Sequence, residues 1–401
     1  MKPPVEMGGA ASVRVDTLVT EDALLSLEPE WRRLESQMIQ LPFVSFDWVI
    51  SWWQHFRSRG RIVRDDLFVC TFRTPAGELL GVAPLMVTER PGIGPLRFRQ
   101  LQFFGADPNV TEVRCIAAAP VDAGALYSAL LEHLRRFQSR WNAVNLTGLP
   151  SNNSALEARI NGVFVSRFWS PDIVNPILEL KPSWQEFRSG LPRNIKESLR
   201  KCYNAPKRDG VSLEFRVLSE TSDVEAALHR FFELHHARAE MSHTVSHADN
   251  FSSCRCREFL LDVARRFAKR GTLRIFQLRH NGSVVATRLG FVLGDSLYLY
   301  YSGFDPNYGH YSVATTVVVE AIKYAIANGF RTLNLSTGRD LSKTRWAPRE
   351  IVYRSVEFSS ETYISILKHR GYRALVRHGS PNGWLLRTFS RERQRRGGLL
   401  Q

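Results

Sequence analysis

The spacing of hydrophobic and polar positions changes several times along the chain, and each change predicts a different element. Between residues 14 and 60, apolar residues recur every three or four positions in "ALLSLEPEWRRLESQM" and "SFDWVISWWQHF". This spacing predicts helices, with Ser45 or Asp47 as the cap of the last one. Four aromatic residues form a stripe that we expect in the core: Trp48, Trp52, Trp53 and Phe56.

The pattern then becomes strand-like up to about residue 150. "DDLFVCTFRT" and "VAPLMVTE" alternate on either side of "PAGELLG", which predicts a hairpin with Gly77 in its turn. "LRFRQLQFFG" predicts another strand, "APVDAGALYSALLEHLRRF" a helix, and "WNAVNLTGLP" a strand. The order of the predicted helices and strands in this part of the chain is therefore typical of an α/β (α+β) unit.

Residues 170–360 show the same theme at greater length. Ser183, with Glu186 three residues later, predicts a helix start, and a basic helix is expected from Asn194 to about Tyr203. Three strands follow, joined at Asn281-Gly282 and at Gly294-Asp295. A turn at 305–309, a helix over 311–328, and the strands "FRTLNLST" and "IVYRSVEFS" complete the order. The repeated order suggests two related halves.

The charge of the chain is +15 and is unevenly distributed. Residues 368–396 contain nine Lys or Arg and one acid, and residues 188–208 form a second basic block. Basic blocks attract nucleic acid, anionic lipid or phosphorylated substrates, although solvated faces and a disordered tail explain them equally well. The segment near the end mixes arginines with Trp384, Leu385, Leu386 and Phe389, a composition that suits an anionic membrane surface.

Other features of the composition narrow the class of protein. Five cysteines in 401 residues favour a reducing compartment without a disulfide framework. Cys254 and Cys256 lie near several histidines, but the spacing matches no standard zinc pattern, so we expect no metal. The apolar runs are shorter than the roughly 20 residues of a membrane span, and the N-terminus has no apolar signal region. We therefore expect a cytoplasmic protein that associates at most peripherally with the inner face of the membrane.

An ordered set of motifs resembles a known family. The motifs are "SWQEFRSGLPRNIKESLRK", "LHHARAE", "GSVVATRLGFVLGDSLYLYYSGFDPNYGHYS" and "LNLSTGRDLSKTRW", with "PFVSFDWVISWW" and "GVAPLMV" in the first half. In this order they resemble the CelD-like branch of the GNAT acetyltransferases, found beside bacterial polysaccharide-synthesis genes. The tandem arrangement is distantly similar to the Fem-type aminoacyl transferases. The resemblance covers about residues 15 to 360.

The resemblance implies a fold and a domain order. We expect two GNAT-like domains, each with a mixed, mostly antiparallel sheet flanked by helices. The expected ranges are a flexible N-terminus (1–13), an N-terminal GNAT-like domain (14–165), a C-terminal acyltransferase domain (166–360) and a basic tail (361–401). The chain departs from the family at Ser312-Val313-Ala314, where Ser-Pro-Gly is usual, and at 334–338, where Asp-Phe-Gly-Arg-Gly is usual.

The implied co-substrate is acetyl-CoA or another acyl-CoA. A helix N-terminus offers unpaired N–H groups and a partial positive charge, which suit a phosphate. The candidate cradle consists of Gly309, His310, Tyr311, Ser312, Val313 and Ala314. Gly309 is expected to supply a positive φ or a close approach, and Ser312 to cap the helix or to donate to a phosphate oxygen. The alternative is an ordinary turn and cap.

Several polar residues are candidates for the chemistry. The catalytic candidates are His235, Asn334, Asp340 and Lys343, and the substrate-binding candidates are Arg238, Tyr301 and Arg345. A histidine or a carboxylate can accept the acceptor's proton, whereas Asn334 can only orient a substrate. Lys343 and Arg345 suit an anionic acceptor or the cofactor phosphates, and a tyrosine among 298–301 suits proton donation to the leaving thiolate. A structural histidine and solvated loop charges are the alternatives.

The sequence therefore predicts an acyl-CoA-dependent N- or O-acyltransferase. The expected acceptor is a sugar, a cell-envelope or lipid-linked precursor, or a small metabolite, with a role in polysaccharide biosynthesis. The alternatives are a Fem-like transferase that uses aminoacyl-tRNA and a catalytically degenerate GNAT-like scaffold. Binding of tRNA is the less expected partnership.

Overall fold

The computed structural model describes residues 13–60, 62–91, 97–107, 109–241 and 247–377. The strands are β1 (Arg14–Leu18), β2 (Arg64–Leu67), β3 (Val69–Arg73), β4 (Leu79–Ala83), β5 (Leu85–Pro91), β6 (Arg97–Phe103), β7 (Ala117–Ala118), β8 (Ala143–Pro150), β9 (Val165–Glu179), β10 (Glu214–Leu218), β11 (Leu273–His280), β12 (Ser283–Leu293), β13 (Ser296–Phe304), β14 (Thr332–Asn334) and β15 (Arg349–Ser359). They form a large sheet in the order β10-β11-β12-β13-β14-β9-β15-β8-β6-β5-β2 and a small one in the order β1-β3-β4-β7.

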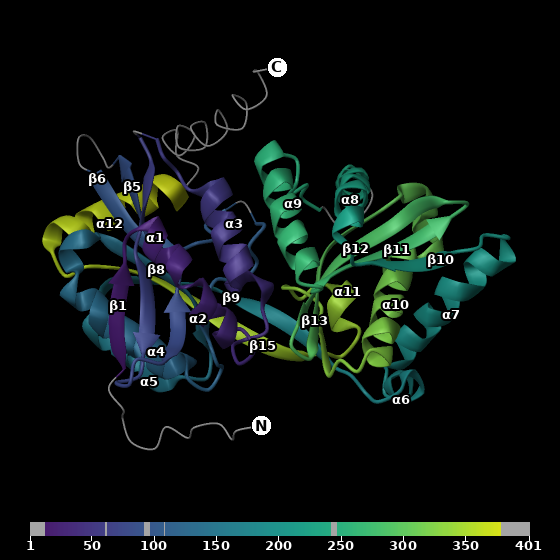
Figure 1. The fold of residues 1–401 in the computed structure, drawn as a ribbon, viewed down its shortest axis with the longest axis horizontal. Coiled ribbons are helices and arrows are strands. Elements are labelled where there is room, and N and C mark those ends of the chain that lie inside the picture. The colour runs from purple at the N-terminus through teal and green to yellow at the C-terminus, as the bar shows by residue number, and fades with distance from the viewer. Residues whose placement is uncertain (1–12, 61, 92–96, 108, 242–246, 378–401) are drawn as a thin grey trace.

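Helices flank both sheets (Figure 1). The α-helices are α1 (Glu21–Ser26), α2 (Glu28–Leu34), α3 (Phe46–Phe56), α4 (Ala123–Arg136), α5 (Ser154–Val163), α6 (Trp184–Ser189), α7 (Arg193–Arg208), α8 (Val224–Ala239), α9 (Cys254–Lys269), α10 (Val313–Ala327), α11 (Leu341–Thr344) and α12 (Tyr363–Arg377). Short 3-10 helices are η1 (Pro42–Val44), η2 (Gln138–Arg140), η3 (Thr221–Asp223) and η4 (Pro306–Tyr311). None of the helices in the described ranges is both long and apolar enough to cross a membrane.

The large sheet is built from two halves with the same local topology. In the first, β5 and β6 are antiparallel, α4 crosses over, and β8 pairs in parallel with β6. In the second, β12 and β13 are antiparallel, α10 crosses over, and β14 pairs in parallel with β13. The expected pair of mixed, mostly antiparallel GNAT-like units is thus confirmed.

The two halves exchange their next strands. β9 follows β8 in the chain but pairs with β14, and β15 follows β14 but pairs with β8. β9 and β15 also pair with each other and run through the middle of the molecule in Figure 1. The halves therefore share one continuous sheet.

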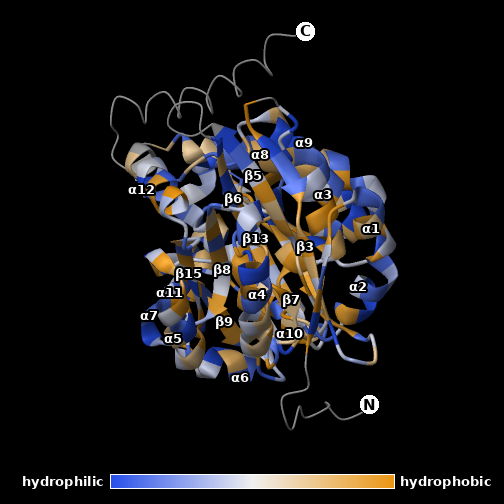
Figure 2. Cartoon of the chain, turned by 90° about the vertical axis from the view of Figure 1, so that its left-hand side faces the viewer, coloured by the Kyte–Doolittle hydropathy of each residue, from blue (hydrophilic) through white to orange (hydrophobic). Residues whose placement is uncertain are grey.

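Three apolar clusters fill the space between sheets and helices. One brings α2 and α3 of the first half against α8, α9 and the strands of the second, and the other two lie within the halves. Figure 2 shows apolar strands in the interior and helices whose polar residues face outward. The aromatic stripe of α3 belongs to the shared cluster, where Trp48 contacts Phe259 edge to face with ring centroids 5.2 Å apart.

Most sequence-based predictions of local structure are confirmed, with one error at the start. Gly77 has a φ of 90° in the turn between β3 and β4, and Asn281-Gly282 joins β11 to β12. The Ser45 and Ser183 side chains cap α3 and α6. Residues 14–18 were expected in a helical region but form β1, because their residues pair with β3 at the edge of the small sheet. Part of the segment assigned to a basic tail forms α12; residues 378–401 lie outside the described ranges.

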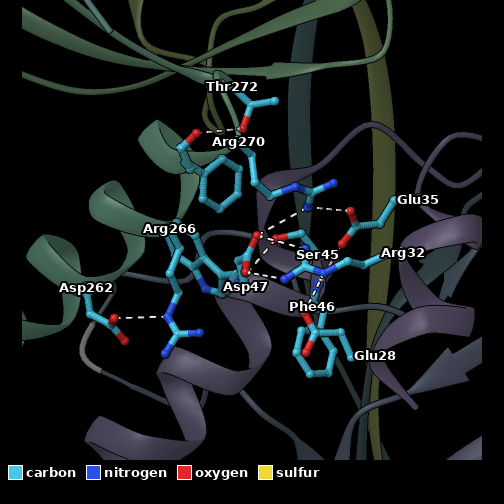
Figure 3. Close-up of polar contacts among 12 residues, drawn as sticks. Glu28, Arg32, Glu35, Ser45, Phe46, Asp47, Asp262, Arg266, Arg270 and Thr272 are labelled. Atoms are coloured by element: carbon cyan, nitrogen blue, oxygen red, sulfur yellow. Dashed lines mark hydrogen bonds and ion pairs between the residues drawn. The ribbon is translucent and has the colours of Figure 1, made fainter. Parts of the chain in front are cut away.

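An ion cluster centred on Asp47 joins the two halves (Figure 3). Arg32 of α2 donates to both Asp47 oxygens at 2.8 and 3.1 Å, and Arg270, at the end of α9, donates to Asp47 at 3.2 Å and to Glu35 at 2.7 Å. Burial raises the pKa of Asp47, but the hydrogen bonds and charges of Arg32 and Arg270 outweigh it and lower the pKa below its usual value. Asp47 is therefore ionised and holds α2, α3 and α9 together.

We predict that Asp47→Asn destabilises the protein by about 2–3 kcal/mol, since two arginines lose their shared carboxylate. A carboxyl with a lowered pKa contributes stability above its unfolded-state value of about 3.9 and loses it as the pH falls. The difference between wild type and variant should therefore shrink below about pH 4. Urea unfolding at several pH values measures this, with the exposed Glu78→Gln as control. An equal loss in both variants would contradict the role of Asp47.

Candidate functional site

The site begins where β13 and β14 diverge. The two strands pair over three residues, from Ser296 with Thr332 to Tyr298 with Asn334, and β13 then continues for six residues more. Beyond Asn334 the chain follows β9 instead: the Leu335 N–H donates to the Pro176 carbonyl at 2.9 Å. The described hydrogen bonds thus direct the two strands along different neighbours.

A bulge in β13 lies beside this divergence. Arg288 of β12 pairs with Ser302, but Gly290 pairs with Leu299, so three steps on β13 match two on β12. A bulge disrupts the simple alternation of side chains. Tyr300 and Tyr301, which are neighbours in sequence, both pack on the shared cluster.

Residues 109–112 of the first half engage three tyrosine hydroxyls of β13. The Tyr298 hydroxyl donates to Glu112, the Tyr300 hydroxyl to the Val110 carbonyl, and the Tyr301 hydroxyl to the Asn109 carbonyl at 2.7 Å. The sequence suggested a tyrosine as a proton donor to a thiolate. In the structure, these three hydroxyls hold β13 against the first half.

Glu112 also connects the first half to the segment after β14. Its Oε1 accepts a hydrogen bond from the Ser336 hydroxyl at 2.6 Å. Burial raises the pKa of Glu112, and the hydrogen bonds from Ser336 and Tyr298 oppose this rise. Sequence reasoning missed Glu112 because no local pattern links it to a residue more than 200 positions away.

Arg238 of α8 reaches the same region. Its Nη1 donates to the Ser302 hydroxyl at 2.9 Å, its Nη2 lies 2.8 Å from His247 Nε2, and its guanidinium lies 5.7 Å from the centre of the Phe304 ring. Burial and the charge of Arg238 lower the pKa of His247, so His247 is neutral and accepts this hydrogen bond.

His235 ties α8 to β13. Its Nδ1 lies 3.0 Å from the Ser302 carbonyl oxygen, and its ring packs against Phe231, Phe251 and Tyr301. Burial lowers the pKa of this histidine, so it is neutral at pH 7.

The other catalytic candidates lie on the β14 side of the point where β13 and β14 diverge. Asn334 ends β14, is 2% exposed, and accepts a hydrogen bond from the Ser336 N–H at 2.9 Å. Asp340 precedes α11, and its Oδ2 lies 3.0 Å from Lys343 Nζ, which also donates to the Thr337 carbonyl. Burial raises the pKa of Asp340, but Ser342 and Lys343 outweigh it and lower the pKa, so Asp340 is ionised.

The candidate cofactor turn contains a left-handed residue, but not the expected one. Ser312 has a φ of 58° and its side chain makes no capping hydrogen bond, whereas Gly309 has no positive φ. The reason is that η4 runs through Gly309 and the reversal into α10 falls on Ser312. The Ser312 carbonyl accepts from the N–H groups of Thr315 and Thr316.

Arg345 lies at the start of α10. Its Nη2 donates to the Thr315 hydroxyl at 2.8 Å, and its Nε is buried without a partner among the described residues. The first N–H groups of the helix, those of Val313 and Ala314, have no backbone acceptor in the described part of the chain. These two N–H groups and the Arg345 guanidinium suit a phosphate. His310 is exposed, and Tyr311 is largely buried.

The structure thus brings most of the predicted residues to two neighbouring places. The first place is the divergence of β13 and β14. Its β13 side is formed by Arg238, Tyr301, His235 and Ser302, and its β14 side by the Asn334–Lys343 segment. The start of α10 with Arg345 forms the second place. The residues that the sequence did not single out are Glu112, Ser302, Ser336 and Arg288. Among the described residues, no group of three or more His, Cys, Asp or Glu could hold a metal ion.

Comparison with known proteins agrees with this geometry. Residues 193–346 match the acetyltransferase (GNAT) domain, a range that contains β13, β14, α10 and α11. No curated protein sequence matches the chain. The match to an acetyltransferase domain supports acyltransferase activity.

Solved structures similar to the chain extend over both halves. FemX is 8% identical with a TM-score of 0.55, and the match covers 88% of this chain and 99% of FemX. A conserved protein of unknown function from Bacteroides thetaiotaomicron VPI-5482 is 12% identical with a TM-score of 0.51, covering 86% and 100%. A tandem GNAT protein from the clavulanic acid biosynthesis pathway is 12% identical with a TM-score of 0.42, covering 88% and 100%. At these identities the first two matches show a shared fold.

We predict that Tyr300→Phe destabilises the protein by about 1–2 kcal/mol, because the buried Val110 carbonyl loses its donor. Chemical denaturation measures the loss. Tyr363→Phe is the matched control, since Tyr363 is 73% exposed. Equal stability of the two variants would show that the contact with residues 109–112 does not hold β13.

Proposed function

We propose that the protein is an acyl-CoA-dependent N- or O-acyltransferase whose acyl donor binds at the start of α10. The observation that carries this proposal is the hydrogen bond from Arg345 to the Thr315 hydroxyl, beside the N–H groups of Val313 and Ala314. These groups lie at the start of the helix that follows β13, the strand that diverges from its parallel neighbour β14. When bound, acyl-CoA supplies a thioester carbonyl as the electrophile. Arg345 and the helix start would hold its phosphates.

Other residues of the chain have roles in this proposal. Asp340 is ionised and half exposed, so it can orient a nucleophilic amine or accept its proton. Lys343 fixes Asp340 and the Thr337 carbonyl, which positions the segment after β14. Asn334 holds the turn at Ser336, and His235 positions Ser302. The acceptor class we favour is a sugar or cell-envelope precursor, as the CelD-like motifs suggest, or a small metabolite.

A Fem-like aminoacyl-tRNA transferase is the second candidate. One observation favours it: α7 buries Ile195, Leu199, Cys202 and Pro206 and exposes Arg200, Lys201 and Lys207 on its outer face. Such a face suits a phosphate backbone. Affinity for tRNA that falls steeply with salt would favour this candidate, and a flat salt response would count against it.

We predict that Arg345→Ala weakens acetyl-CoA binding by about tenfold or more, because a charge-assisted contact with a phosphate is lost. Isothermal titration with acetyl-CoA and longer acyl-CoAs measures this. Arg216→Ala is the control, since Arg216 is an exposed arginine of the same half that pairs with Glu214. The absence of binding to any thioester would refute the acyl-CoA proposal.

We predict that Lys343→Ala lowers the turnover number by about tenfold or more with little change in acetyl-CoA affinity, because Asp340 loses its ion pair. Steady-state kinetics and titration separate the two effects. Thioester binding without transfer by the wild type would instead favour the scaffold alternative.

A further inference from the structure

Arg288 is a partly buried cation that has no partner in the ranges that the structure describes. It lies on β12 opposite Ser302, and its side chain forms no hydrogen bond or ion pair with the described residues. Its Nε is buried. A desolvated, unpaired guanidinium is costly, so proteins normally pair it with a carboxylate, a phosphate or another acceptor.

A second arginine lies within electrostatic range. Within the described part of the chain, Arg238 bonds only to neutral groups, the Ser302 hydroxyl and the neutral His247 ring. Burial, and then the positive charge of Arg238, lowers the pKa of Arg288 to about 10. The positive charges of Arg238 and Arg288, both near Ser302, therefore destabilise each other when no anion is bound between them.

The nearby carboxylates do not neutralise this pair. Glu112 and Asp340 act on Arg288 electrostatically, but neither forms an ion pair with it. Glu112 is bonded to Tyr298 and Ser336, and Asp340 to Lys343. The arginines thus keep unused donors at the divergence of β13 and β14.

We propose that Arg288 and Arg238 form a subsite for an anionic group, a carboxylate or a phosphate, that a substrate carries in addition to the phosphates held at the start of α10. Two guanidiniums provide planar donor pairs that match either anion. The proposal rests on the acyltransferase function and specifies its substrates as acidic. The anion belongs either to the acyl group of the donor or to the acceptor.

The first test uses bare anions, so it does not depend on acyl-CoA. Thermal unfolding is followed for wild type, Arg288→Met and the control Arg216→Met, with and without succinate or inorganic phosphate at constant ionic strength. We expect Arg288→Met to melt at or above the wild-type temperature without anion, and the anion to raise the wild-type midpoint by about 2 °C but not that of Arg288→Met. An equal shift in both proteins, or a lower midpoint of Arg288→Met without anion, overturns the subsite.

The second test identifies the source of the anion. Binding of succinyl-CoA is compared with that of acetyl-CoA, and turnover with acetyl-CoA is compared for glucosamine 6-phosphate and glucosamine. A preference of about tenfold for succinyl-CoA assigns the anion to the donor, and a similar preference for glucosamine 6-phosphate assigns it to the acceptor. The preference should be lost in Arg288→Met and restored by Arg288→Lys. Lost acetyl-CoA affinity in Arg288→Met shows that Arg288 serves the cofactor phosphates, and a response to bare anions alone shows an adventitious ion only. Both results overturn the proposal, whereas failure of acetyl-CoA to bind the wild type refutes the acyltransferase function separately.

Discussion

The hydrogen bonds that hold the chain after β14 on β9 determine where the site opens. Leu335 and Gly338 donate to carbonyls of β9, while β13 stays with β12 and with the segment 109–112. The two parallel strands are therefore kept apart by their own neighbours. Since residues 109–112 and the whole of β9 precede the matched GNAT segment 193–346, the first half is a structural part of the site rather than a separate unit.

The local charges of the site are more informative than the net charge of the chain. Arg238, Arg288 and Arg345 approach the divergence or the start of α10 and have no carboxylate partner among the described residues, whereas Glu112 and Asp340 are already bonded. Many other arginines of the chain form ion pairs, such as Arg32 and Arg270 with Asp47. These three cations therefore lie where a thioester donor and an acidic substrate would need them.

The sequence predicts features that depend on neighbouring residues and misses those that depend on distant ones. The turn at Asn281-Gly282, the cap at Ser45 and the apolar face of α7 are local, so periodicity and turn chemistry reveal them. Contacts such as that of Glu112 with Ser336 join segments 224 positions apart, and no local pattern marks them. Arg288 was missed for the same reason, since only the register of β12 with β13 places it near Arg238. The exchange of β9 and β15 between the halves likewise depends on long-range pairing.

The altered turn before α10 is compatible with a phosphate site. The family's usual proline would lack an N–H group at the position of Val313, whereas valine provides one. Val313 is fully buried in the core of the second half, which fixes the direction of the helix start. The left-handed backbone at Ser312 costs on the order of 1 kcal/mol, and it persists because η4 and α10 on either side are both held by packing. Because Arg345 donates a hydrogen bond to Thr315, this turn combines backbone donors with a positive charge. The departure from the family sequence therefore changes how the donors are supplied and does not remove them.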